Sequence, residues 1–161
     1  MIPVPLPHPE NPMHRLTVSV LALGLALGLA LGTAVAAQEP NRLVTFLTAP
    51  EPQTQLMAMV LTMNAMAAGA EAEMLLCGPA GDIALKEAPA SATAGQPPKD
   101  ASPQGLMAMM MEKNGLKVQV CAIYLPGRGA DASILIDGVT AAAPDAMGAA
   151  VVAPGTSVMS F

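Results

Sequence analysis

Aromatic side chains are almost absent from this chain, which has two phenylalanines, one tyrosine and no tryptophan. Positive charge is scarce as well, because seven Lys and Arg residues stand against twelve Asp and Glu, for a net charge of −5. The basic residues form no run and no patch interleaved with aromatics, which is the composition that nucleic-acid surfaces need. We therefore expect no nucleic-acid partner.

The beginning of the chain has the order of a secretory signal peptide. A short basic stretch precedes a mostly apolar run over 16–31, and small residues follow. An apolar run of about 16 residues is shorter than the roughly 20 that span a bilayer. We therefore expect a signal peptide over 13–37, cleaved after Ala36 or Ala37, and a periplasmic protein that keeps no membrane segment after cleavage. Residues 1–12 look like an upstream extension.

Histidine is missing from everything that follows the expected cleavage point, since the two histidines are His8 and His14. Without an imidazole, Ser-His and Cys-His hydrolases and histidine-based zinc sites are excluded for the mature chain. We expect neither a metal nor a cofactor. Any nucleophilic cysteine would have to act without a histidine partner.

The remaining residues, 38–161, are enough for a single α/β domain with a core. Strand and helix patterns alternate along them, which predicts an α/β fold: a three-layer α/β/α sandwich with a five-stranded, mainly parallel sheet. Residues 88–103 are mostly Ala, Ser, Pro, Gly and Thr, and are expected to form a flexible surface loop that covers a site. Strands are predicted over 42–48, 71–77, 116–121, 139–141 and 156–161, helices over 53–68, 104–114 and 144–153, and helical turns over 82–87 and after Asp131.

One of the two cysteines, Cys121, ends an apolar strand pattern and leads into a loop that carries Arg128. Open α/β sheets bind their ligands at the carboxyl ends of parallel strands. A thiol there is partly solvated, and a nearby arginine or backbone amides would favour its thiolate form. Cys121 is therefore the candidate nucleophile, although many single cysteines are inert, buried small hydrophobes. Tyr124 in the same loop is expected to pack or anchor the loop.

These segments together resemble the DsrE/DsrF family, which includes the sulfur-relay subunit TusD. The resemblance is carried by a Val-Thr-Phe first strand, an alanine-rich helix ending in Ala-Gly-Ala, an acidic strand running to Cys77-Gly78, a Val-Cys segment followed by Arg128-Gly129, and a last strand ending in Phe161. Many family members have a second cysteine where this chain has Tyr124, and studied sulfur relays are cytoplasmic, so the chain looks like an exported variant.

The resemblance implies a function for the candidate nucleophile. Cys121 would accept sulfane sulfur as a persulfide and pass it to a partner thiol, with Arg128 as a candidate thiolate stabiliser and the loop over 88–103 as shelter. Such a sulfur carrier or sulfurtransferase exchanges sulfur with donor and acceptor proteins or small thiols. Family members assemble as dimers, trimers of dimers or mixed hexamers. Together with helices that are apolar on all sides, this predicts a homo-oligomer.

Cys77 ends the second predicted strand as Cys121 ends the third. If the first strand lay between them, the two cysteines would be roughly 9 to 10 Å apart, too far for a disulfide. If the second and third strands were neighbours, a bridge could form, and an oxidising compartment would favour it. Its apolar neighbours Leu75 and Leu76 predict a structural role for Cys77.

Two other functions compete with sulfur transfer. The chain has 13 methionines, with Met59, Met63 and Met66 at helical spacing and a second group over 107–111. Thioethers bind copper(I), so a methionine-rich periplasmic copper protein is one alternative, although methionine stripes more often fill a core. The other is a non-catalytic interaction module that kept the DsrE fold without its chemistry.

Overall fold

The computed structural model describes residues 41–161, so the predicted signal peptide over 13–37, its cleavage site and the extension 1–12 lie outside the described residues. The described part contains a five-stranded sheet in the order β4-β3-β2-β1-β5. All four pairings are parallel, which confirms the predicted α/β fold. The strands are β1 (Arg42–Leu47), β2 (Glu71–Leu76), β3 (Lys117–Val120), β4 (Thr140–Ala141) and β5 (Thr156–Ser160).

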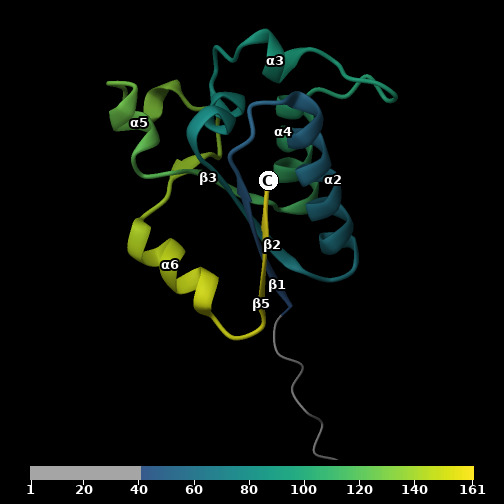
Figure 1. The fold of residues 1–161 in the computed structure, drawn as a ribbon, viewed down its shortest axis with the longest axis vertical. Coiled ribbons are helices and arrows are strands. Elements are labelled where there is room, and N and C mark those ends of the chain that lie inside the picture. The colour runs from purple at the N-terminus through teal and green to yellow at the C-terminus, as the bar shows by residue number, and fades with distance from the viewer. Residues whose placement is uncertain (1–40) are drawn as a thin grey trace, which may run out of the picture. The chain divides into compact units, whose positions relative to one another are not determined.

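Helices cover both faces of the sheet, as the alternating pattern predicted (Figure 1). Helices α2 (Pro52–Ala67) and α4 (Pro103–Asn114) pack side by side on one face, and α6 (Pro144–Val152) lies on the other. The shorter helical segments are η2 (Gly78–Ala84), α3 (Ala90–Thr93), α5 (Tyr124–Gly127) and η3 (Ala132–Ile134).

The ends of α4 show why the helix forms where the sequence predicted it. The Ser102 hydroxyl accepts a hydrogen bond from the Gly105 amide at 3.1 Å, and Pro103 occupies the first turn, where its missing N–H costs nothing. Gly115 ends the helix with a φ of 72°, a left-handed conformation that glycine adopts without a steric penalty.

Methionine fills much of the core between the sheet and the α2 and α4 layer. Met59, Met107 and Met110 are fully buried in one cluster with strand residues such as Val118. A smaller cluster on the other face of the sheet joins Val44, Leu75 and Ala142 to Met147 of α6. These thioethers take the volume that aromatic rings occupy in other cores, which supports the packing interpretation of the methionine groups.

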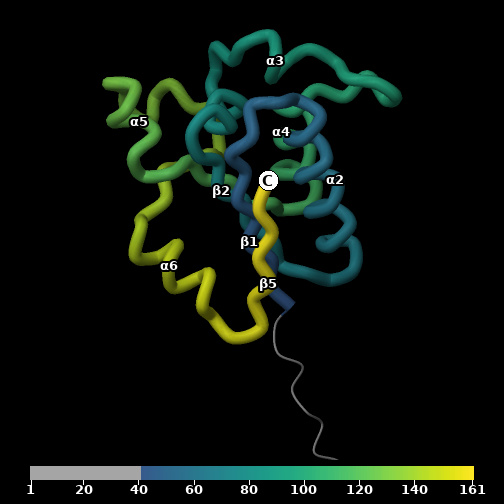
Figure 2. Tube along the Cα trace, viewed as in Figure 1, coloured from purple at the N-terminus to yellow at the C-terminus, as the bar shows by residue number. Residues whose placement is uncertain are grey.

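Residues 88–103 are more structured than predicted. They contain α3, and an antiparallel bridge joins Gln96 to Ala101. Figure 2 shows this segment passing near α2 and α4, and residues 96–101 form one wall of a pocket whose other wall is α2. Ala92 is buried and anchors the segment, which the alanine-rich composition did not reveal. None of the described helices has the length and apolar character needed to cross a membrane.

Candidate functional site

The candidate nucleophile is covalently bonded to the other cysteine. Cys77 and Cys121 form a disulfide with their Cα atoms 5.1 Å apart, so neither described cysteine is a free thiol. β2 and β3 are neighbours in the sheet, which is the arrangement under which a bridge between the two cysteines was predicted. Cys77 is half-buried at the end of β2, and its side chain bonds to Cys121 directly.

Strand order is the reason that the two sulfurs meet. β2 and β3 are neighbours, and their register pairs Leu76 with Val120, so Cys77 and Cys121 are the next residues along both strands. The Cys77 amide donates to the Leu47 carbonyl at 2.9 Å, and the Cys121 amide donates to the Leu76 carbonyl at 2.9 Å. The sheet's hydrogen bonding thus continues through both cysteines and fixes their backbones.

An apolar pocket of about 540 Å³ lies beside Cys121. Cys121 is half-buried, and two side chains of the pocket wall, Ile123 and Val152, are 80 % and 79 % exposed. The lining holds no charged side chain, and no part of it comes from residues 88–103, so the predicted shelter by that loop is not what the structure shows. Ile123 and residues of α6 line the pocket instead. The lining residues are Phe46, Leu75, Cys121, Ala122, Ile123, Ala142, Pro144, Met147, Gly148, Val151 and Val152.

Arg128 contacts a carboxylate of the neighbouring loop. Its guanidinium donates to Asp82 Oδ1 at 2.9 Å and lies 5.5 Å from the centre of the Tyr124 ring. The Tyr124 hydroxyl donates to the same Asp82 oxygen at 2.7 Å. The predicted role of Arg128 beside the Cys121 sulfur therefore has no contact to support it. Asp82, which sequence reasoning missed, is the partner that the structure provides.

This cluster holds the two cysteine loops together. Asp82 belongs to η2, which follows Cys77, whereas Tyr124 and Arg128 follow Cys121. Burial raises the pKa of Tyr124 above its ordinary value of 10, and the hydrogen bond to Asp82 and that carboxylate's charge raise the pKa further, while Arg128 opposes them. The phenol consequently stays protonated at neutral pH. This agrees with the expectation that Tyr124 anchors the loop.

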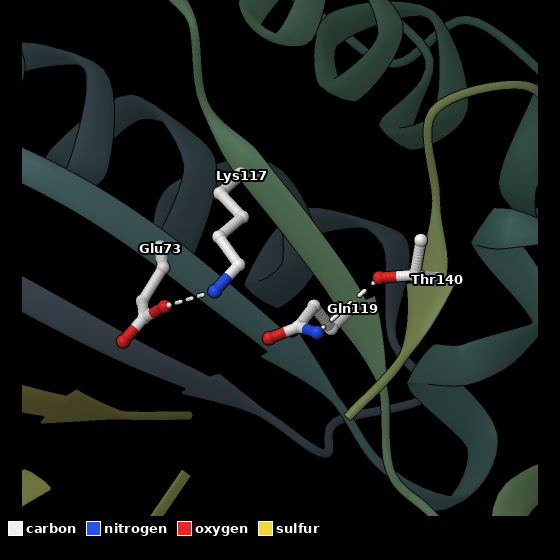
Figure 3. A network of polar contacts seen from close by, with 4 residues as sticks. All are labelled: Glu73, Lys117, Gln119 and Thr140. Atoms are coloured by element: carbon white, nitrogen blue, oxygen red, sulfur yellow. Dashed lines mark hydrogen bonds and ion pairs between the residues drawn. The ribbon is translucent and has the colours of Figure 1, made fainter. Parts of the chain in front are cut away.

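A second group of polar contacts lies on the sheet away from the cysteines (Figure 3). Lys117 Nζ donates to Glu73 Oε2 at 3.1 Å, and Gln119 donates to the Thr140 hydroxyl at 3.2 Å. The Glu73 side chain is 11 % exposed and the Lys117 side chain 60 %. Because Lys117 begins β3 and Cys121 follows its end, this ion pair belongs to the opposite end of the strand and stabilises the β2–β3 pairing.

The fold places the chain in the class of open, parallel α/β domains with a candidate site at the carboxyl edge of the sheet. No protein-family model matches the sequence, and no curated protein does. Solved structures do share the fold. One is MTH1491 from Methanobacterium thermoautotrophicum, described as a protein of unknown function, with a TM-score of 0.56 and 14% identity, over 74% of this chain and 98% of that one.

A second similar structure is YchN from E. coli, with a TM-score of 0.56 and 16% identity over 75% of this chain and 99% of that one. Both likenesses support the DsrE-like fold that the sequence resemblance implied. At these identities they establish the architecture alone. The chemistry has to be argued from the cysteines and their surroundings.

Proposed function

We propose that the reduced protein is a sulfur carrier or sulfurtransferase that accepts sulfane sulfur on Cys121 and passes it to a partner thiol. The Cys121 thiolate attacks the outer sulfur of a donor persulfide, and the donor leaves as a thiolate. A partner thiolate then attacks the outer sulfur on Cys121 and takes it away. The main support is that Cys121 opens into an uncharged pocket with an exposed rim, where a guest sulfur has both room and access.

The apolar wall suits this chemistry. A persulfide in open water is exposed to other thiols and oxidants, whereas one in an apolar pocket is reached only from the mouth. The exposed Ile123 and Val152 at that mouth are a surface on which a donor or acceptor can dock. Arg128, bound to Asp82, contributes by positioning the Cys121 loop.

The periplasm is the proposed compartment. Support comes from the leader pattern over 13–37 and from the disulfide itself, because disulfides persist in oxidising compartments. The disulfide also means that Cys121 has to be reduced before it can accept sulfur. A dithiol reductant is therefore a further proposed partner.

Thiol–disulfide exchange with a partner protein is the second candidate function, and the Cys77–Cys121 bond is the observation that favours it. A partner dithiol would attack the half-buried Cys121 from the pocket side, which leaves Cys77 and Cys121 reduced and the partner's own cysteines oxidised to a disulfide. This function needs no sulfane sulfur. The two candidates therefore differ in whether the protein ever gains mass.

Intact-mass measurement on the Cys77→Ser protein tests sulfur acceptance. This variant has a free Cys121 and cannot form the internal disulfide. After reduction, removal of the reductant and incubation with a small persulfide, we expect a gain of about one sulfur atom, roughly 32 Da, that a dithiol removes.

The control is the Cys77→Ser, Cys121→Ser protein, which should gain nothing. An unchanged mass in Cys77→Ser would overturn the sulfur-transfer proposal. In that event, oxidation of a partner's dithiol by the disulfide-bonded wild-type protein would favour thiol–disulfide exchange, and no reaction at all would leave a non-catalytic interaction module.

A further inference from the structure

Cys77 lies where a second thiol could react with a sulfur-loaded Cys121. We propose that Cys77 is the resolving thiol, which discharges the Cys121 persulfide as sulfide and leaves the Cys77–Cys121 disulfide. This inference rests on the proposed function and adds to it the fate of the bound sulfur. It also gives the observed disulfide a place in the reaction, as the product of one turnover.

Distance supports the assignment. The Cα atoms of the two cysteines are 5.1 Å apart, within the range from which two cysteines form a disulfide without backbone movement. The backbone amides of both cysteines are held in the sheet's hydrogen bonding, and the Asp82 cluster joins the loops that follow them. Cys77 is therefore held within reach of the Cys121 sulfur by the fold itself.

The direction of attack sets a requirement as well. Attack on a sulfur atom proceeds in line with the bond that breaks, so Cys77 and the departing sulfur have to lie on opposite sides of Cys121 Sγ. Cys121 lines the apolar pocket, and Cys77 is absent from its lining. In-line attack therefore requires the guest sulfur to lie in the part of the pocket on the far side of Cys121 Sγ from Cys77.

The electron balance is complete. The Cys77 thiolate attacks Cys121 Sγ, the new Sγ–Sγ bond forms, the bond to the outer sulfur breaks, and that sulfur leaves as hydrosulfide. The sulfane sulfur gains two electrons, which the two cysteine thiols supply by becoming a disulfide. A dithiol, protein or small molecule, then reduces the disulfide by exchange and is itself oxidised, which restores both thiols for the next donor.

Two reactions therefore compete for a sulfur bound to Cys121. An acceptor thiol that enters by the pocket attacks the outer sulfur and keeps it as sulfane sulfur. Cys77 attacks the inner sulfur and releases sulfide. In the absence of an acceptor, the internal reaction prevails because Cys77 is held next to its target by the fold.

The test compares the reduced wild-type protein with Cys77→Ser and Cys121→Ser, each given one equivalent of a small persulfide with a radioactive outer sulfur. For the wild type we expect release of about one labelled sulfide per chain, and a product about 2 Da lighter than the reduced protein, as disulfide formation requires. Cys77→Ser should keep the label and the added mass, and release no more sulfide than buffer does. Cys121→Ser should gain little label, because Cys77 does not line the pocket.

The outcomes separate the two proposals. Retention of the label on Cys77→Ser together with retention on the wild type would overturn the resolving role and leave sulfur acceptance intact. No label on Cys77→Ser would overturn the proposed function itself. Equal labelling of Cys77→Ser and Cys121→Ser would overturn the assignment of the two roles to these two cysteines.

Discussion

At the residue scale, Tyr124 links the two loops that follow the cysteines. Its ring is buried, its hydroxyl is bound to Asp82, and Arg128 lies beside both. A hydrogen bond from a neutral phenol to a carboxylate is stronger than one between neutral groups. This hydrogen bond joins the loop after Cys77 to the loop after Cys121. Its loss would therefore loosen both loops without changing either cysteine.

The titration of Tyr124 can be measured without interference, because the chain has one tyrosine and no tryptophan. We expect the phenolate absorbance near 295 nm to appear at a midpoint well above pH 10, since burial and Asp82 both raise the pKa. Asp82→Ala should move the midpoint down, because it removes the bond and leaves Arg128 in place. Glu112→Gln on α4 is the control and should change nothing. A wild-type midpoint at or below 10 would contradict the packing described for Tyr124.

The same shift has a consequence for stability. A raised pKa means that the folded state favours the protonated phenol more than the unfolded state does. Its contribution to the free energy of unfolding is therefore complete below pH 10 and is lost as the pH rises through the raised pKa. The loosening of the cysteine loops that comes from Tyr124 ionisation should therefore begin only above pH 10.

At the scale of elements, the site consists of two strand ends and the short helices that follow them. η2 begins directly after Cys77, and α5 begins shortly after Cys121. The Tyr124 ring of the second element packs on Gly81 of the first so closely that a methyl group at position 81 would overlap it. The pairing of these two elements therefore requires glycine at that position.

Gly81→Ala should destabilise the protein by about 1 to 3 kcal/mol, as overpacking of a buried contact does. Gly127→Ala is the matched control in α5, because an added methyl there meets no atom within 4 Å and the backbone has no positive φ. Its effect should stay within about 0.5 kcal/mol. Urea unfolding followed by far-UV circular dichroism measures both. Equal stability of the two variants would show that the η2–α5 contact is looser than described.

At the scale of the whole molecule, α2 carries a partly exposed apolar face beside the segment 96–101. Met57, Val60 and Leu61 are 52 %, 37 % and 42 % exposed, at a spacing that puts them on one side of the helix. An interface between copies would cover this apolar surface, which a single copy leaves exposed. We propose that copies of this chain associate through this face of α2.

Leu61→Glu should lower the molecular mass measured by light scattering to that of the monomer, because a buried unpaired carboxylate is costly in an apolar interface. Ala149→Glu is the control, since it adds the same charge to an exposed position of α6 on the opposite face of the sheet. It should leave the mass unchanged. A monomeric wild-type protein would contradict association, and an unaltered assembly in Leu61→Glu would exclude α2 as its interface.

Much of the architecture could be predicted from the sequence, because it depends on local signals. Apolar runs bounded by proline and glycine located the strands and the three long helices, and their alternation gave a parallel sheet. The prediction was less accurate where local signals are weak. The turn after Cys121 contains α5, and residues 88–103 hold α3, which small buried side chains anchor.

The sequence by itself determined that Cys121 stands at a strand end near a basic residue, and that no histidine beyond position 14 could assist it. Only the tertiary structure decided that Cys77 is its partner and that Asp82, not the sulfur, binds Arg128. The physical reason is strand order. Periodicity reports which face of an element is buried, but the neighbour of each strand is set by packing of the whole sheet, and that choice brought β2 beside β3 and one sulfur against the other.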